Sequence, residues 1–247
     1  IRNIRKIYMV ACGSAYHTGV TAKYVFEGLA RIPVEVDLAS EFRYRNPIFG
    51  ENMLVIVVSQ SGETADSLAA LREAKAHGIR TLGIVNVVGS SIAREADHVM
   101  YTWAGPEIAV ATTKAYSTQL IAQYLLAIKF AEVRGTVKPE ERAAMVAELR
   151  QLPEQISLLL SHKKNVQKFA NRYLAAEHVF FIGRGIDYAI SLEGSLKLKE
   201  ISYIHSEAYA AGELKHGTIS LIEDGRLVVA VLTQPALYKK TLSNVVE

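Results

Sequence analysis

Apolar runs rich in β-branched residues alternate along this chain with stretches of helical period, and this alternation limits the possible folds more than any other feature. The runs cover residues 7–11, 34–38, 53–58, 81–86 and 98–103. The runs at 7–11 and 53–58 lack polar alternation, which is typical of central strands covered on both faces. Strands that alternate with helices form parallel sheets flanked by helices. The sequence therefore predicts an α/β fold of the doubly wound type.

The last third of the chain starts the same pattern again. A strand is expected over 178–182, followed by a glycine turn, a helix over 188–204 and a strand over 227–232. Without a gap, the segment Val10–Phe42 aligns with Ile182–Leu214, which pairs Gly13 with Gly185, Tyr16 with Tyr188, Ala39 with Ala211 and Glu41 with Glu213. These pairs favour a duplicated unit. The alternative is that any two strand–helix units share a glycine turn.

The segment between the two units is expected to be helical. A long apolar helix over 113–133 ends near Gly135, and the more charged segment that follows contains Pro139 and Pro153 as interruptions. We expect a first unit at residues 1–135, a helical linkage at 136–176 and an incomplete second unit at 177–247.

The composition excludes several classes of protein. The formal net charge is only +3, and no dense Lys/Arg block argues for nucleic acid or an anionic membrane as a partner. Cys12 is the only cysteine, which excludes an internal disulfide and fits a reducing cytoplasm. The longest apolar runs fall far short of the ~20 residues that span a bilayer, and the first residues do not read as a signal peptide. The seven histidines have no paired metal spacing, so no metal site is expected.

The segment Ser59–Thr64 follows the apolar run 53–58 directly and precedes a helix expected over 65–77. It offers three hydroxyl groups, and Gly62 allows close approach to its backbone. The first N–H groups of a helix lack partners and carry the positive end of the dipole, so an anion binds there. The alternative is that Ser61 or Thr64 only caps the helix. The segment is neither a Walker loop nor a dinucleotide fingerprint.

Two further turns place hydroxyl groups before an expected helix. Cys12–Ser14 follows the first strand, and Val110–Lys114 opens the long helix. Thr112 or Thr113 could serve equally as a cap or as a ligand contact. A nucleophilic role for Cys12 has no evident base nearby, and a small buried residue is the commoner role.

Charged residues of the second unit offer proton chemistry. Glu193, Lys197 and Glu200 follow helical spacing on one face, which is also typical of a solvated ion-pair ladder. His216 lies in the glycine-bracketed polar segment Gly212–Gly217, where it is suited to moving protons near neutral pH or to a purely structural role.

Four segments together resemble the isomerase part of the glucosamine-6-phosphate synthase family. They are Cys12–Gly13, Ser59–Thr64, Leu196–His205 and Glu207–Gly217. The hydroxyl-rich segment alone is shared by the wider sugar isomerase (SIS) family, which includes regulators that only bind. The resemblance implies two SIS units with parallel five-stranded sheets, the second of them incomplete. It also implies a homodimer that makes glucosamine 6-phosphate from fructose 6-phosphate and glutamine-derived ammonia without a cofactor or metal.

The resemblance also implies roles for individual residues. The phosphate would be held by Ser59, Gln60, Ser61 and Thr64, and the sugar would be lined by Cys12, Gly13, Ser14, Val110 and Thr112. Glu200 would shuttle the proton between C1 and C2 with Lys197 beside it, and His216 would assist ring opening from the neighbouring subunit. The family commonly has two hydroxyl residues after Cys-Gly, whereas Ala15 follows Ser14 here, which puts one sugar contact in doubt.

Two parts of the resembling enzymes have no counterpart in this sequence. These are the N-terminal glutaminase domain, with its cysteine, and a C-terminal tail with a lysine thought to form a Schiff base. We therefore expect the chain to be part of a longer cytoplasmic enzyme. The alternatives are a regulatory SIS module that binds a sugar phosphate without catalysis, and a different sugar-phosphate isomerase or deaminase of the same fold.

Overall fold

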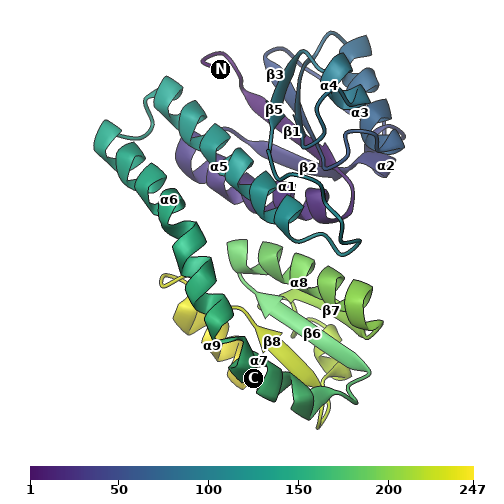
Figure 1. The fold of residues 1–247 in the computed structure, drawn as a ribbon, viewed down its shortest axis with the longest axis vertical. Coiled ribbons are helices and arrows are strands. Elements are labelled where there is room, and N and C mark those ends of the chain that lie inside the picture. The colour runs from purple at the N-terminus through teal and green to yellow at the C-terminus, as the bar shows by residue number, and fades with distance from the viewer. The chain divides into compact units, whose positions relative to one another are not determined.

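The computed structural model describes residues 1–247, which divide into two compact units at Ile1–Val146 and Ala147–Glu247 (Figure 1). The division falls within helix α6 (Pro139–Ser161), so part of the expected helical linkage belongs to each unit. Each unit contains its own parallel sheet.

The first unit is built on the five-stranded parallel sheet that the apolar runs predicted. Its strands are β1 (Lys6–Ala11), β2 (Val34–Leu38), β3 (Met53–Ser59), β4 (Arg80–Val85) and β5 (His98–Tyr101). Their order across the sheet is β2-β1-β3-β4-β5, and every neighbouring pair is parallel. The central strands β1 and β3 are almost entirely buried, which explains why their sequences lack polar alternation.

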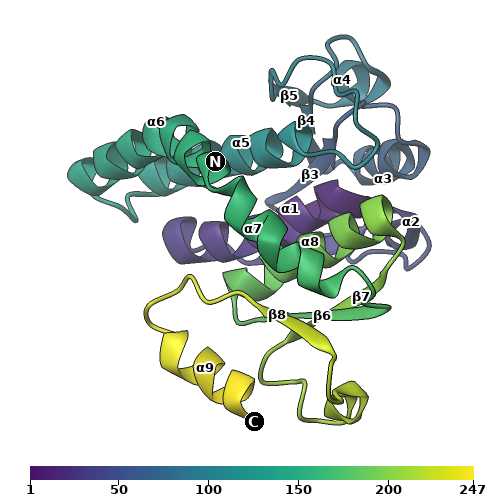
Figure 2. The ribbon, with the colours of Figure 1, turned by 60° about the horizontal axis from the view of Figure 1, so that its bottom comes forward.

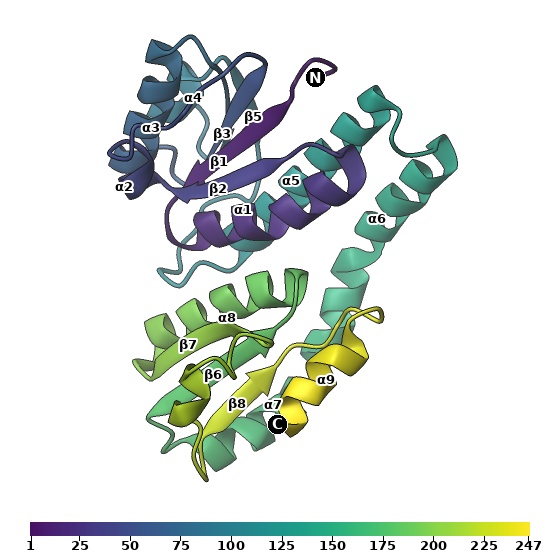
Figure 3. The same cartoon turned by 180° about the vertical axis from the view of Figure 1, so that it is seen from behind.

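Helices cover both faces of this sheet. They are α1 (Gly13–Val25), continued by a π-helical turn at Phe26–Ala30, α2 (Ala39–Phe42), α3 (Ala65–Ala76), α4 (Ser91–Glu95) and α5 (Lys114–Arg134). Alternate residues of β1 enter different cores: Ile7 packs in the cluster that includes Phe130 of α5, and Tyr8 packs in the cluster that includes Leu71 of α3. Figure 3 shows α1 and α5 on one side of the sheet and α2, α3 and α4 on the other.

The second unit has a three-stranded parallel sheet. Its strands are β6 (His178–Gly183), β7 (His205–Ala210) and β8 (Leu227–Ala230), in the order β7-β6-β8. Its helices are α7 (Lys163–Ala170), α8 (Ile186–Ser202) and α9 (Tyr238–Val246), with short 3₁₀ turns at Asn171–Tyr173 and Thr218–Leu221. Figure 2 shows α8 and α9 on opposite sides of the small sheet.

The second sheet repeats the start of the first. Its order β7-β6-β8 corresponds to β2-β1-β3, and the gapless alignment of the two sequences places all of β6 on β1. The expectation of an incomplete second unit agrees with three strands in place of five.

Two local expectations differ from the structure. Strand β7 was not expected, because its sequence His-Ser-Glu-Ala-Tyr-Ala is mostly polar and contains no β-branched residue. Pro153 was expected to interrupt the linkage, yet α6 continues through it. No residue of α6 is buried, so water can reach the backbone groups that a proline leaves without an intrahelical partner. None of the helices combines the length and the apolar character needed to cross a membrane.

Candidate functional site

The strand order of the first unit identifies the edge at which a ligand would bind. After β1 the chain turns to β2 on one side, and after β3 it turns to β4 on the other side. In open sheets of this order, ligands bind at the carboxyl ends of the two strands where the direction reverses. We call this position between β1 and β3 the switch point. Cys12–Ser14 and Ser59–Thr64 are the segments that follow these two strands, so the topology brings them to the same edge.

The hydroxyl groups of Ser59–Thr64 are ordered by the loop itself. Ser59 Oγ accepts a hydrogen bond from the N–H of Gly62 at 3.0 Å and lies 3.0 Å from Thr64 Oγ1. Thr64 is the N-cap residue of α3, but its side chain makes no capping bond to that helix. Ser61 Oγ accepts from the N–H of Glu63, which lies outside the helix. The simple capping interpretation therefore fails for both residues, and the first turn of α3 has no side-chain cap.

Gly62 allows the loop to pack against the neighbouring helix α4. It has φ of +68°, and a Cβ atom there would lie 2.0 Å from Ser90 Oγ. The Gly62 carbonyl accepts from Ile92 N at 3.0 Å, and Glu63 Oε1 accepts from Ser91 N at 2.7 Å. The hydrogen bonds from Ser91 hold the pKa of Glu63 below its ordinary value. The loop is thus fixed to α4 on one side and leads into α3 on the other.

The other segment at the switch point, Cys12–Ser14, begins helix α1. Gly13 has φ of +55°, which favours glycine there, and it is exposed, whereas Cys12 and Ser14 are half-buried. Cys12 Sγ lies 4.0 Å from Ser67 Oγ of α3. The neighbour of the thiol is a hydroxyl and not a base, so the geometry adds nothing to the nucleophilic interpretation of Cys12.

Glu107 organises the segment that contains Val110 and Thr112. The hydroxyl of Thr112 donates to Glu107 Oε2 at 2.8 Å, and the N–H of Ala115 donates to the same oxygen at 3.2 Å. The hydrogen bond from Thr112 is the main cause that lowers the pKa of Glu107. The sequence analysis did not identify Glu107. The signal that could have indicated it is an acidic residue shortly before a long helix. Val110 is 97% exposed, so it is packed against nothing.

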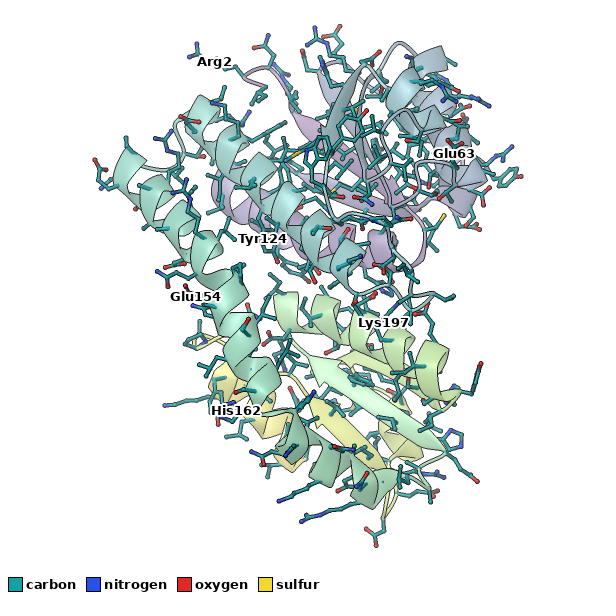
Figure 4. All side chains as sticks on the ribbon, in the orientation of Figure 1. Arg2, Glu63, Tyr124, Glu154, His162 and Lys197 are labelled. Atoms are coloured by element: carbon teal, nitrogen blue, oxygen red, sulfur yellow. The ribbon has the colours of Figure 1, made fainter.

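The charged face of α8 is partly enclosed. Lys197 Nζ lies 3.5 Å from Glu193 Oε1 and donates a hydrogen bond to Glu200. Glu193 is only 5% exposed, and the side chains of Lys197 and Glu200 are 20% and 31% exposed. The three side chains therefore form the ion-pair ladder that their spacing predicts, but they are not fully solvated. One ammonium lies between two carboxylates, and all three groups are partly buried. Figure 4 labels Lys197 on α8 and Glu63 beside α3.

His216 lies on the surface of the second unit. It belongs to the turn segment that follows β7, and its N–H donates to the Glu213 carbonyl at 2.9 Å. The predicted binding residues lie within Cys12–Ser14 and Ser59–Thr64 and at Val110 and Thr112, so they belong to the first unit. The predicted catalytic residues Lys197, Glu200 and His216 belong to the second.

Strand β7 carries polar contacts that the sequence did not indicate. The Tyr209 hydroxyl donates to the Glu207 carboxylate, and this bond raises the pKa of Tyr209 to about 12. On the same side, His205 Nε2 lies 3.8 Å from Glu207 Oε1, and His205 Nδ1 lies 3.2 Å from His178 Nδ1. The contacts on β7 could have been found only if the segment had been assigned to a strand, because they need alternate residues on one face.

The structure holds no cluster of metal ligands, and a cavity of the first unit lies away from the switch point. No three or more His, Cys, Asp or Glu side chains gather as ligands for a metal ion. A cavity of about 900 Å³ lies by residues 1–4, 49–53, 77–80 and Val133. It borders the amino ends of β3 and β4, at the edge of the sheet opposite the switch point.

The sequence matches the SIS domain family over residues 1–129 and 173–246. It is 61% identical over its whole length to the glutamine–fructose-6-phosphate aminotransferase (isomerizing) of Caldanaerobacter subterraneus, and 61% identical to that of Clostridium acetobutylicum. The chain spans 41% of the length of each of these relatives.

Solved structures agree with this match. The C-terminal domain of glucosamine-fructose-6-phosphate aminotransferase from Francisella tularensis superposes with a TM-score of 0.96 at 41% identity, covering 98% of this chain and 68% of that one. A glucosamine-6-phosphate deaminase from Thermotoga maritima superposes with a TM-score of 0.78 at 28% identity, covering 98% of this chain and 74% of that one.

We predict that Gly62→Ala destabilises the first unit more than Gly89→Ala does. Both glycines have positive φ, +68° and +73°, but a Cβ at position 89 meets nothing within 4 Å. Gly89→Ala should cost about 1 kcal/mol for the backbone conformation alone, and Gly62→Ala roughly 2–4 kcal/mol, because Ser90 is buried and must move. Urea unfolding measures both values. Equal losses would show that the loop does not depend on contact with Ser90.

We also predict that the hydrogen bond between Tyr209 and Glu207 stabilises the fold below pH 10 and that this stabilisation is lost at higher pH. The pKa of Tyr209 is raised from 10.0 to about 12, so the contribution is complete below pH 10 and is lost as the pH rises toward 12. Glu207→Gln removes the negative charge and should return the pKa of Tyr209 toward 10.0. The ultraviolet absorbance of tyrosinate follows the titration, with Tyr209→Phe to identify the late component. Superimposable curves for the wild type and Glu207→Gln would contradict the assignment.

Proposed function

The chain belongs to the SIS domain family, and from this premise we propose that it is the isomerase part of a glutamine–fructose-6-phosphate aminotransferase. It converts fructose 6-phosphate and ammonia to glucosamine 6-phosphate, and a glutaminase domain elsewhere in the full-length enzyme supplies the ammonia. The observation that carries the proposal is the Ser59–Thr64 loop, whose hydroxyls and amides gather before an uncapped helix at the switch point.

The phosphate of the substrate binds to Ser59, Gln60, Ser61 and Thr64. A phosphate ester is a dianion with three acceptor oxygens, and it matches a site that offers N–H and O–H donors at the positive end of a helix dipole. Support comes from the hydrogen bond that already joins the Ser59 and Thr64 hydroxyls and from the absence of a side-chain cap on α3.

The sugar extends from the phosphate along Cys12, Gly13, Ser14, Val110 and Thr112. Thr112 already donates its hydroxyl proton to Glu107, so it serves the sugar as an acceptor of a hydrogen bond. The exposure of Val110 is consistent with a residue that closes over a ligand.

Glu200 transfers the proton between C1 and C2 during ketose–aldose interconversion. The reaction needs a positioned carboxylate and a donor at the oxygen or nitrogen on C2. Lys197 holds the Glu200 carboxylate by a hydrogen bond on the same helical face, and its own position is fixed by Glu193. His216 assists opening of the sugar ring from a neighbouring subunit, so the functional state is a homodimer; its exposure on the surface supports this role.

The remaining assignments follow the same premise. Residues 1–135 form the first SIS domain, 136–176 the helical linkage and 177–247 the incomplete second SIS domain. The enzyme acts in the cytoplasm with its sugar phosphates as small-molecule partners.

We predict that Glu200→Gln separates catalysis from binding. The wild-type chain should exchange solvent deuterium into fructose 6-phosphate at C1, and the variant should lose at least about 100-fold of this rate because the amide cannot accept the proton. Fructose 6-phosphate, glucose 6-phosphate and glucosamine 6-phosphate should still raise the melting temperature of the variant. At ~100 times the dissociation constant the stabilisation is about 2.7 kcal/mol.

Glu154→Gln is the matched control, because Glu154 is an exposed carboxylate of α6. It should leave exchange and melting unchanged. Unaltered exchange in Glu200→Gln would refute the role of Glu200. Stabilisation by the sugar phosphates without exchange in the wild type would favour the regulatory SIS module, and flat melting curves with all three ligands would refute the phosphate site itself.

A further inference from the structure

The second unit has a switch point of its own, between β6 and β8. Register pairs Val10 of β1 with Val57 of β3 in the first unit, and Ile182 of β6 with Ala230 of β8 in the second. Counting from these pairs, the segment that matches Ser59–Thr64 is Leu232–Leu237, and each segment leads directly into a helix, α3 or α9. The two units can therefore be compared residue by residue at this point.

The matching loop has lost the features of an anion site. Leu232, Gln234 and Leu237 stand where the first unit has the hydroxyls of Ser59, Ser61 and Thr64. Pro235, which has no N–H group, stands in place of Gly62.

A buried carboxylate of the chain itself binds the loop at this second switch point. Asp187 is in the first turn of α8 and is only 2% exposed. Its Oδ2 accepts a hydrogen bond from the N–H of Thr233 at 3.0 Å, and its Oδ1 accepts one from the Thr233 hydroxyl. The equivalent position in the first unit is Ala15, whose methyl side chain carries no charge and is shorter than that of Asp187.

Further hydrogen bonds connect the segments that meet at the second switch point. Gln234 Nε2 donates to the Arg184 carbonyl at 2.7 Å, and the Arg184 guanidinium donates to Asn244 Oδ1 of α9 at 2.6 Å. A Cβ atom on Gly185 would lie 3.4 Å from Gln234, whereas its equivalent Gly13 has nothing within 4 Å.

We propose that the Asp187 carboxylate is the anion at the switch point of the second unit, in the place that the substrate's phosphate takes in the first unit. It thereby fixes the start of the helix that carries Lys197 and Glu200. A carboxylate in the first turn of a helix is favoured by the dipole, and here it also satisfies a backbone N–H and a hydroxyl of the β8–α9 loop. Asp187 is a positioning residue for α8. Only the comparison with the phosphate site rests on the proposed function.

Rescue by a small anion tests the proposal. Asp187→Ala leaves a buried space with the Thr233 donors facing it, and its melting temperature should fall by roughly 10 °C. Sodium formate should restore at least half of this loss, because formate has the size and charge of the missing carboxylate, while equal sodium chloride should not. Asp187→Asn fills the same space with an amide, so formate should not raise its melting temperature.

Asp97→Ala is the matched control. Asp97 Oδ2 accepts from Thr81 N at 2.8 Å and from Thr81 Oγ1 at 2.9 Å, but its side chain is 39% exposed, so water replaces it and formate should have no effect. Equal effects of formate and chloride on Asp187→Ala, or rescue of Asp187→Asn, would overturn the proposal. If Asp187→Ala is insoluble, recovery of folded protein only in formate supports the proposal, and no recovery in formate contradicts it.

Fructose 6-phosphate added to Asp187→Ala separates this inference from the proposed function. Thermal stabilisation by the sugar phosphate without rescue by formate would refute only the role of Asp187. Rescue by formate without stabilisation by the sugar phosphate would refute only the phosphate site of the first unit.

Discussion

The first N–H groups of α3 lack side-chain partners. They lie at the carboxyl edge of a parallel sheet, at the point where the order of strand connections reverses. Because all five strands run the same way, the carboxyl ends of β1 and β3 share that edge, and each is followed by a helix. The dipole of one helix contributes only about 0.3–1 kcal/mol to binding an anion, whereas each hydrogen bond to a charged group contributes roughly 1.5–3 kcal/mol. The hydroxyls and amides of Ser59–Thr64 would therefore dominate the proposed interaction with a phosphate, and the loop geometry that Gly62 permits would matter more than the helix dipole.

The two units use the same topology in different ways. In the first, the residue at the start of α1 is Ala15, and the loop after β3 carries hydroxyl groups. In the second, Asp187 occupies the equivalent position and contacts the loop after β8. In the proposed function, the first unit binds the phosphate of the substrate. The second unit presents the charged face of α8, where Lys197 lies between Glu193 and Glu200.

Features fixed by local pattern were predictable, and features fixed by contacts between distant residues were not. The buried strands β1 and β3 were visible as uninterrupted apolar runs, and β6 and α8 were visible as an apolar run, a glycine turn and a stretch of helical period. Strand β7 was missed because its polar side chains are satisfied by neighbours on β6 and on the strand itself. Glu107 and Asp187 were missed for the same reason, since their partners Thr112, Ala115 and Thr233 are defined by the fold and not by spacing. The hydroxyl-rich loop Ser59–Thr64 could be proposed as an anion site from its chemistry, but the predicted role of each residue in binding and turnover depends on the resemblance to the synthase family.

The most direct test of the phosphate site is the ³¹P NMR titration of fructose 6-phosphate bound to this chain. The free ester takes up a proton with a pKa of about 6. Donors that favour the dianion lower that pKa, so the resonance of the bound ester should stay constant as the pH falls through about 6. In Gly62→Ala the bound population should fall and the free titration should return. A bound resonance that titrates at or above the pKa of the free ester would contradict a site built from helix amides and hydroxyls.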